Sequence, residues 1–342
     1  MGAKAFITGL SGPALTPDER AFLASEQPWG FILFKRNIET RAQVSDLVSE
    51  LRMAVGDADA PVLIDQEGGR VQRLQPPAWR SYPSGATLGQ LFECDPAQGL
   101  RAAWLSSRLI AADLADLGVD VDCLPLADVP IAGADSVIGD RAYGTSVATV
   151  TTVARAVSEG LLDGGVLPVL KHIPGHGRAM ADSHHVLPVV DASRAELEAV
   201  DFAAFRALSD LPMAMTAHVI FNAYDSLRPA TTSATIIDEV IRGRIGFGGL
   251  LMGDDVSMNA LKGSIAERTR DIVAAGCDVV LACNGRFEEM RAVADNVPEL
   301  AGAALDRADA ALAVRRPARA LDRDAARAEL DALLARAGEL SA

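Results

Sequence analysis

Eight short apolar runs recur along the chain, and segments with helical patterning separate them. The runs are AFITGL (5–10), WGFILFK (29–35), PVLIDQ (61–66), VDVDCLPLADV (119–129), VLPVLKH (166–172), PMAMTAH (212–218), GGLLMGD (248–254) and DVVLACN (278–284). Most of them are apolar at consecutive positions, which is typical of strands buried on both faces of a parallel sheet. The pattern therefore predicts eight parallel strands.

Helix-start signals and amphipathic spacing occupy the stretches between these runs. Thr16 precedes Pro17, Asp18 and Glu19, and further helices are expected over 40–53, 193–208 and 231–241. Parallel strands need crossover connections, which are usually helical. Eight such units predict a (β/α)₈ TIM barrel, although strand number alone does not distinguish it from an open doubly wound sheet.

The chain after about residue 285 is rich in Ala, Arg, Asp and Glu, and its charges alternate as on solvated helices. No linker or repeat marks a boundary before it. We therefore expect one domain over 1–342, with closing helices at the end.

Composition and charge limit the kinds of molecule that the protein is expected to bind. The chain has 49% hydrophobic and 23% charged residues and a formal net charge of −14, so nucleic acid and anionic membranes would be repelled. A small-molecule substrate and a monomer are the expectation. The N-terminus lacks a signal-peptide pattern and no apolar run is long enough to span a bilayer, which predicts a cytoplasmic location.

The four cysteines are scattered without metal-ligand or redox spacing. They are expected to be reduced, buried and inert, and they are Cys94, Cys123, Cys277 and Cys283.

In a barrel of this kind the active site forms where the strands end. Polar residues cluster at several predicted strand ends. They are Asp65, Gln66, Glu67, Arg70 and Arg73 after the third run, Gly139, Asp140 and Arg141 after the fourth, Lys171 and His172 at the fifth, His218 at the sixth, and Asp254 and Asp255 at the seventh.

Four of the five histidines lie in KHIPGHGRAMADSHH (171–185). His172 and His176 are four apart, the spacing of a helical metal site. Pro174, Gly175 and Gly177 disfavour a helix there, so the metal site is the weaker interpretation.

Asp182, Ser183 and His184 suggest a different chemistry. Residues two apart in an extended segment project to the same side, so the Asp182 carboxylate can orient the His184 ring as a general acid/base. Pro174, Gly175 and Gly177 suit a loop that closes over substrate. Asp254 ends an apolar run and can supply the nucleophile of a glycosidase, while Asp255 is the better candidate for capping the next helix.

Taken together, IDQEGGRVQRL (64–74), IGDRAYG (138–144), LPVLKHIPGHG (167–177) with DSH, and GFGGLLMGDDVSM (246–258) resemble a known family. They are similar to the bacterial β-N-acetylhexosaminidases of glycoside hydrolase family 3, the single-domain cytoplasmic type that acts in peptidoglycan recycling. The resemblance implies a retaining glycosidase with Asp254 as nucleophile, His184 as acid/base and Asp182 tuning it. It implies N-acetylglucosamine binding by Asp65, Arg73, Arg141, Lys171 and His172, with no cofactor and no metal.

Two departures from the family pattern stand out. Gly253 replaces the Ser or Thr that commonly precedes the nucleophile, and RAMA (178–181) replaces more polar residues before DSH. Alternatives therefore stay open: an N-acetylglucosamine phosphorylase or a β-glucosidase of the same family, a metal-dependent barrel hydrolase, or an inactive sugar-binding barrel. The roles of His176, His185, Glu67 and Arg70 are also left open.

Overall fold

The computed structural model describes residues 2–183 and 186–340. Within these residues eight parallel strands form one sheet, in which each strand overlaps one of the predicted apolar runs. The strands are β1 (Lys4–Thr8), β2 (Pro28–Leu33), β3 (Val62–Ile64), β6 (Val121–Asp122), β7 (Leu167–Ile173), β9 (Met213–Thr216), β11 (Leu250–Met252) and β12 (Val280–Ala282). From β1 to β11 they are neighbours in chain order, and β12 pairs with β1.

The two ends of the sheet meet. Met252 in β11 forms a parallel bridge with Val279, the residue before β12. Two backbone hydrogen bonds flank this bridge: Gly253 N–H donates to Val279 at 3.1 Å, and Asp278 N–H donates to Leu251 at 2.8 Å. These contacts close the barrel, so the (β/α)₈ prediction is confirmed and the open sheet is excluded.

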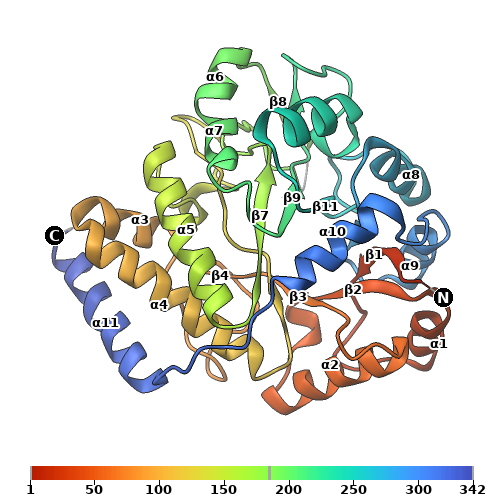
Figure 1. The fold of residues 1–342 in the computed structure, drawn as a ribbon, viewed down its shortest axis with the longest axis horizontal. Helices are drawn as coiled ribbons and strands as arrows, with labels where there is room; N and C mark the ends of the chain where they lie inside the picture. The colour runs from red at the N-terminus through yellow and green to blue at the C-terminus, as the bar shows by residue number, and fades with distance from the viewer. Residues whose placement is uncertain (1, 184–185, 341–342) are drawn as a thin grey trace.

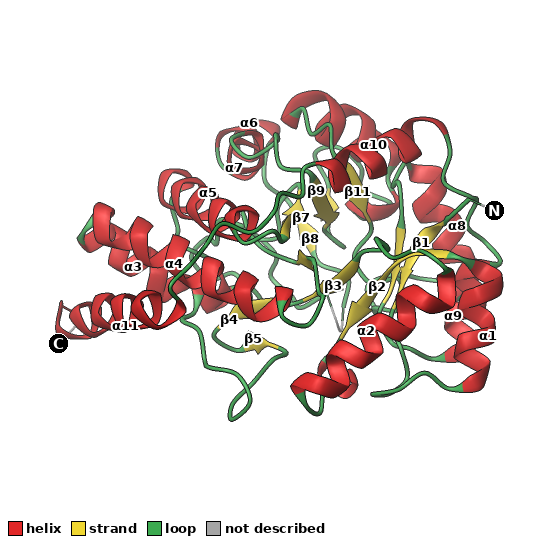
Figure 2. Cartoon of the chain, turned by 60° about the horizontal axis from the view of Figure 1, so that its bottom comes forward, coloured by secondary structure: helices red, strands yellow, loops and turns green. Residues whose placement is uncertain are grey.

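Helices surround the barrel, as Figures 1 and 2 show. They are α1 (Pro17–Glu26), α2 (Arg41–Val55), α3 (Gly85–Cys94), α4 (Pro96–Ala115), α5 (Val147–Asp163), α6 (Arg194–Ala199), α7 (Asp201–Arg206), the π-helix η4 (Ile236–Ile245), α8 (Ile265–Ala275) and α9 (Phe287–Ala294). Short elements at the strand ends are the 3₁₀ turns η1 (Lys35–Asn37), η2 (Gly139–Arg141) and η3 (Ala230–Thr232), and the strand pairs β4 (Gln66–Gly68) with β5 (Val71–Gln72) and β8 (Val189–Val190) with β10 (Ile220–Phe221).

The predicted and observed starts of a helix agree where a side chain caps the first turn, as at α1 and α2. Thr16 accepts from the Glu19 N–H at 3.1 Å, and the Glu19 carboxylate accepts from the Thr16 N–H at 2.9 Å. This reciprocal capping satisfies two backbone donors that the helix itself cannot. At α2 the Thr40 hydroxyl accepts from the Gln43 N–H, and Gly56 ends the helix in the left-handed conformation that glycine adopts readily.

Three predicted elements are shorter or broken. The run 119–129 contributes only two residues to β6, because Pro125 has no N–H; the run then continues beside β7 through an isolated bridge between Leu126 and Lys171. The helix predicted over 193–208 is interrupted at Val200, whose φ and ψ are not helical. The helix predicted over 231–241 starts later, because Ser233 is extended and its hydroxyl caps Ile236.

The chain after 285 packs on the barrel and shares its core. Helices α10 (Gly302–Ala313) and α11 (Arg323–Leu340) follow α9, and α11 lies beside α3 and α4 (Figure 1). Leu330 of α11 belongs to the single hydrophobic cluster that includes the barrel strands. Ion pairs of Arg101 with Glu329 and of Arg323 with Asp116 border this contact.

Three of the four cysteines are buried as expected, but Cys94 is exposed. The prediction was wrong there because Cys94 is the last residue of α3, at an exposed corner where Asp95 ends this helix and caps α4. Of the helices in the described part of the chain, none is long and apolar enough to cross a membrane.

Candidate active site

A cavity of about 770 Å³ opens at the carboxyl ends of the barrel strands. Its lining includes residues that follow β3, β7, β11 and β12, together with the loops 135–141 and 182–183. All the described residues for which a site role is expected line it. They are Asp65, Arg73, Arg141, Lys171, His172, Asp182 and Asp254.

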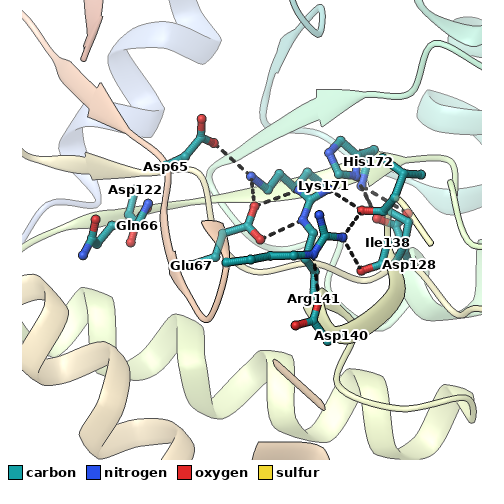
Figure 3. A network of polar contacts seen from close by, with 12 residues as sticks. Asp65, Gln66, Glu67, Asp122, Asp128, Ile138, Asp140, Arg141, Lys171 and His172 are labelled. Carbon is teal, nitrogen blue, oxygen red and sulfur yellow. Dashed lines mark hydrogen bonds and ion pairs between the residues drawn. The ribbon is translucent and has the colours of Figure 1, made fainter. Parts of the chain in front are cut away.

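A buried ion network centred on Glu67 lines one wall of the cavity, and Figure 3 shows its contacts. The Lys171 ammonium lies 2.6 Å from Glu67 Oε1. On its other side Glu67 receives two hydrogen bonds from the Arg141 guanidinium, at 2.8 and 2.9 Å. Such a paired contact fixes the orientation of both side chains. Glu67, whose role the sequence left open, therefore forms an internal ion pair with two cations.

Asp65 joins the same network from the end of β3. Its Oδ1 accepts from Lys171 Nζ at 3.1 Å, and its Oδ2 accepts from Arg73 Nη2 at 2.9 Å. The Arg73 guanidinium also lies 5.1 Å from the centre of the Phe34 ring. Three cations thus meet two carboxylates at this wall of the cavity.

These charges hold one another ionised. Burial alone would raise the pKa of Glu67, but Lys171 and Arg141 outweigh it and lower the pKa to about 2. Burial would also raise the pKa of Asp65, and Lys171 and Arg73 bring it well below its ordinary value. Conversely, burial would lower the pKa of Lys171, but Glu67 and Asp65 raise it. The site therefore presents fixed donors and acceptors suited to hydroxyl and carbonyl oxygens.

His172, at the end of β7, is oriented by a residue that sequence reasoning missed. Asp128 is fully buried, and its Oδ2 lies 2.8 Å from His172 Nδ1. Its Oδ1 accepts the backbone N–H of His176 at 2.6 Å. Asp128 stands near the end of the fourth apolar run, so the strand-end rule that found Asp65 and Asp254 could also have found it.

The segment after β7 is tied down in its first half. Gly177 packs against the neighbouring loop, where an added Cβ would lie 2.2 Å from the Val129 carbonyl oxygen. Arg178 pairs with the buried Asp201 at 2.6 Å. Gly177 therefore allows close packing against this loop, whereas the composition of the segment had suggested mobility. The closing motion of the loop stays a prediction.

Of the predicted acid/base pair, Asp182 lines the cavity and is partly buried. Ser183 beside it is buried, and its hydroxyl lies 3.1 Å from His176 Nε2. His184 and His185 lie outside the described residues.

Asp254 follows β11, and its backbone is held in place by neighbouring strands. Its N–H points to the Thr216 hydroxyl at 3.4 Å, and its Oδ1 accepts from the Asp255 N–H at 2.8 Å. Buried His218 supports the same turn, because its Nε2 contacts the Asp255 carbonyl oxygen at 2.9 Å. Asp254 lines the cavity from this anchored position.

Asp255 does not cap a helix, so that expectation was wrong. Ser264 caps α8, nine residues further along the chain. The Asp255 carboxylate instead accepts from the backbone N–H groups of Ser257 and Cys283, both at 3.1 Å. It joins the chain after β11 to the end of β12.

Gly253 packs against two methyl groups. An added Cβ would lie 3.2 Å from Ile272 Cγ2 and 3.3 Å from Thr231 Cγ2. Both contacts are to side chains that can give way slightly, so the position has little room for a Ser or Thr side chain but is not closed by backbone.

The helical metal-site interpretation fails on geometry. His172 is in a strand and His176 is in the loop after it, with their rings edge to face at 5.7 Å between centroids. Across residues 2–183 and 186–340, the His, Cys, Asp and Glu side chains form no group of three that could hold a metal ion.

Arg70, also left open, lies at the cavity rim. It pairs with Asp140 at 2.8 Å and donates to the Val137 carbonyl at 2.6 Å. It therefore links the β4–β5 turn to the loop that carries Arg141.

Comparison with known proteins agrees with this architecture. The profile described as "Glycosyl hydrolase family 3 N terminal domain" matches residues 8–316. The chain is 38% identical over 284 residues to a protein of Bordetella avium named beta-hexosaminidase, covering 81% of this chain and 80% of that one. A beta-hexosaminidase of Alkalilimnicola ehrlichii is 38% identical over 297 residues, covering 86% and 84%.

A solved structure is similar over the whole chain. It is NagZ from Neisseria gonorrhoeae in complex with N-trifluoroacetyl-D-glucosamine, with 30% identity, a TM-score of 0.84, and coverage of 100% of this chain and 99% of that one. The barrel, its site at the strand ends and these relatives agree with one another. The chain therefore belongs to glycosyl hydrolase family 3, as a glycoside hydrolase of the bacterial β-N-acetylhexosaminidase type.

Proposed function

We propose that the protein removes a terminal β-linked N-acetylglucosamine unit by a retaining mechanism. Asp254 attacks the anomeric carbon and forms a glycosyl ester while His184, as imidazolium, protonates the leaving oxygen. Neutral His184 then takes a proton from water, which attacks the ester and releases the sugar with its configuration retained. Asp182 accepts a hydrogen bond from the imidazole and orients it.

One observation carries the proposal. Asp254, the ion network and the Asp182–Ser183 segment line the same cavity, although they follow different strands. Burial and the neighbouring His172 lower the pKa of His176 to about 4, and the Asp254 charge acts on it in the opposite sense. His176 contacts Ser183, and both line the cavity together with Asp254, which supports an acid/base and a nucleophile that act at one site.

The ion network supports the sugar-binding roles. Asp65 accepts from sugar hydroxyls, while Arg73, Arg141 and Lys171 donate to hydroxyl and acetamido oxygens. Each of these groups is already held by ion pairs, so little side-chain entropy is lost when sugar binds. The gonococcal neighbour described with N-trifluoroacetyl-D-glucosamine supports an N-acylated sugar as the ligand.

The proposed natural substrate is a peptidoglycan fragment, N-acetylglucosaminyl-1,6-anhydro-N-acetylmuramic acid with or without its peptide. This proposal rests on the motifs shared with the recycling-type family and on the similarity to the gonococcal protein. It is consistent with a cytoplasmic role in cell-wall recycling.

Hydrolysis of paired aryl glycosides tests the activity. We expect the aryl β-N-acetylglucosaminide to be cleaved, the matching β-glucoside to be left nearly intact, and proton NMR to show the β-anomer first. Preferential cleavage of the glucoside, or release of the α-anomer, would contradict the proposal. Glycosyl phosphate as the main product in millimolar phosphate would instead identify a phosphorylase, and loss of activity after chelation would favour the metal-dependent alternative.

A further inference from the structure

His176 is buried in the wall of the cavity and has no part in the mechanism above. Its relative exposure is 3%, the same as that of Ser183. Its Nε2 lies 3.1 Å from the Ser183 hydroxyl, whereas its Nδ1 is buried without a hydrogen-bond partner. A buried N–H without a partner is rarer than an unpaired acceptor. We therefore assign the ring proton to Nε2, which donates to Ser183.

The backbone of His176 is fixed at the same time by Asp128. This fully buried carboxylate accepts the His176 N–H at 2.6 Å through Oδ1 and contacts the His172 ring at 2.8 Å through Oδ2. A continuous chain of contacts thus runs from His172 through Asp128 and His176 to Ser183. Ser183 stands between the two residues proposed to handle the proton.

We propose that His176 is a positioning residue for proton transfer, because it holds Ser183, the residue that precedes the proposed acid in the chain, at the lining of the cavity. This inference rests on the proposed function. Asp128 fixes the position of the His176 backbone, and the His176 ring in turn fixes Ser183 through its hydrogen bond.

Geometry gives the contact its importance. A general acid must lie within hydrogen-bond reach of the leaving oxygen, about 2.6–3.2 Å. A displacement of about 1 Å can cost roughly a hundredfold in rate. Backbone hydrogen bonds tie residues 175–179 to the chain around them, and the His176 ring contacts Ser183 from this anchored part of the segment. Removing this contact loosens the acid without removing it.

The test uses the intact protein and two substrates that differ in their need for the acid. A phenyl glycoside needs a proton on its leaving oxygen, and a dinitrophenyl glycoside does not. For Ser183→Ala and His176→Phe we expect kcat/KM on the phenyl substrate to fall about tenfold or more, and on the dinitrophenyl substrate less than about threefold, as loss of part of the general-acid contribution requires. His176→Gln, whose amide can reach Ser183, should recover most of the loss.

Controls make each outcome decisive. Ser158→Ala removes a buried hydroxyl in α5 that bonds the Ala154 carbonyl, and it should leave the ratio of the two substrates unchanged. The double variant Ser183→Ala/His176→Phe should be no worse than either single one, because both remove the same contact. A parallel fall on both substrates, or no fall, overturns the role of His176. If His184→Ala lowers kcat/KM equally on the phenyl and dinitrophenyl substrates, the proposed function fails and this inference fails with it.

Discussion

The ammonium group of Lys171 lies 2.6 Å from the carboxylate of Glu67, and both side chains are almost completely buried, at 2% and 4% exposure. The pair joins β7 to β4 at the lining of the cavity. Removing one partner leaves the other charge poorly compensated in the interior. Such losses are much larger than those of exposed ion pairs.

We therefore predict that Lys171→Met lowers the free energy of unfolding by about 3 kcal/mol or more. The matched control is Arg70→Ala, which breaks the exposed pair with Asp140 and should cost less than about 1 kcal/mol. Urea unfolding of both variants measures the difference. Equal losses would show that the buried pair has no special weight.

The Glu67 carboxyl makes the free energy of unfolding depend on pH in the acidic range. Burial opposes its ionisation, but Lys171 and Arg141 lower the pKa to about 2 in the folded protein, whereas an unfolded Glu has a pKa of about 4.3. The stabilisation is therefore present above about pH 4.3 and is lost as pH falls towards 2. The stability gap between wild type and Glu67→Gln should shrink over that range in unfolding curves. A gap that is constant or widens in acid would contradict this.

Asp122 should behave with the opposite sign. It is fully buried, its Oδ2 has no hydrogen-bond partner, and burial raises its pKa well above the ordinary value. A group with a raised folded pKa stabilises below the unfolded pKa, about 3.9 for Asp, and loses that contribution as pH rises. Asp122→Asn should thus gain stability relative to wild type between pH 4 and pH 7. A relative loss over this interval would refute the assignment.

Two glycines of the site should differ in their tolerance of a methyl group. At Gly177 a Cβ would meet a backbone carbonyl at 2.2 Å, and at Gly253 it would meet side-chain methyls at 3.2 and 3.3 Å. Gly177→Ala should lower the free energy of unfolding by about 2–3 kcal/mol, and Gly253→Ala by less than about 1 kcal/mol. Thermal unfolding of both compares them, and the reverse order would be inconsistent with the packing.

The barrel was predictable because its strands coincide with short apolar runs in the sequence and helical patterns lie between these runs. The strand-end rule then located Asp65, Lys171, His172 and Asp254 within one cavity. The same rule could also have found Asp128, which lies near the end of the fourth apolar run. Short breaks, such as Val200 in a predicted helix, depend on tertiary packing that local patterns do not carry.

The partners within the site were not predictable from local sequence. Glu67 and Arg141 are 74 residues apart, and Asp65 and Lys171 are 106 apart. Only closure of the barrel brings them together. The unpartnered Nδ1 of His176 likewise depends on the three-dimensional surroundings.

The central claim is that Asp254 forms a covalent bond to the sugar. Peptide mass spectrometry after treatment with a fluorinated N-acetylglucosaminyl inactivator tests it most directly. The account predicts one sugar label per chain, on the Asp254 side chain, with loss of activity in proportion to labelling and no label in Asp254→Asn. A label on another residue, or full turnover by Asp254→Asn, would contradict it.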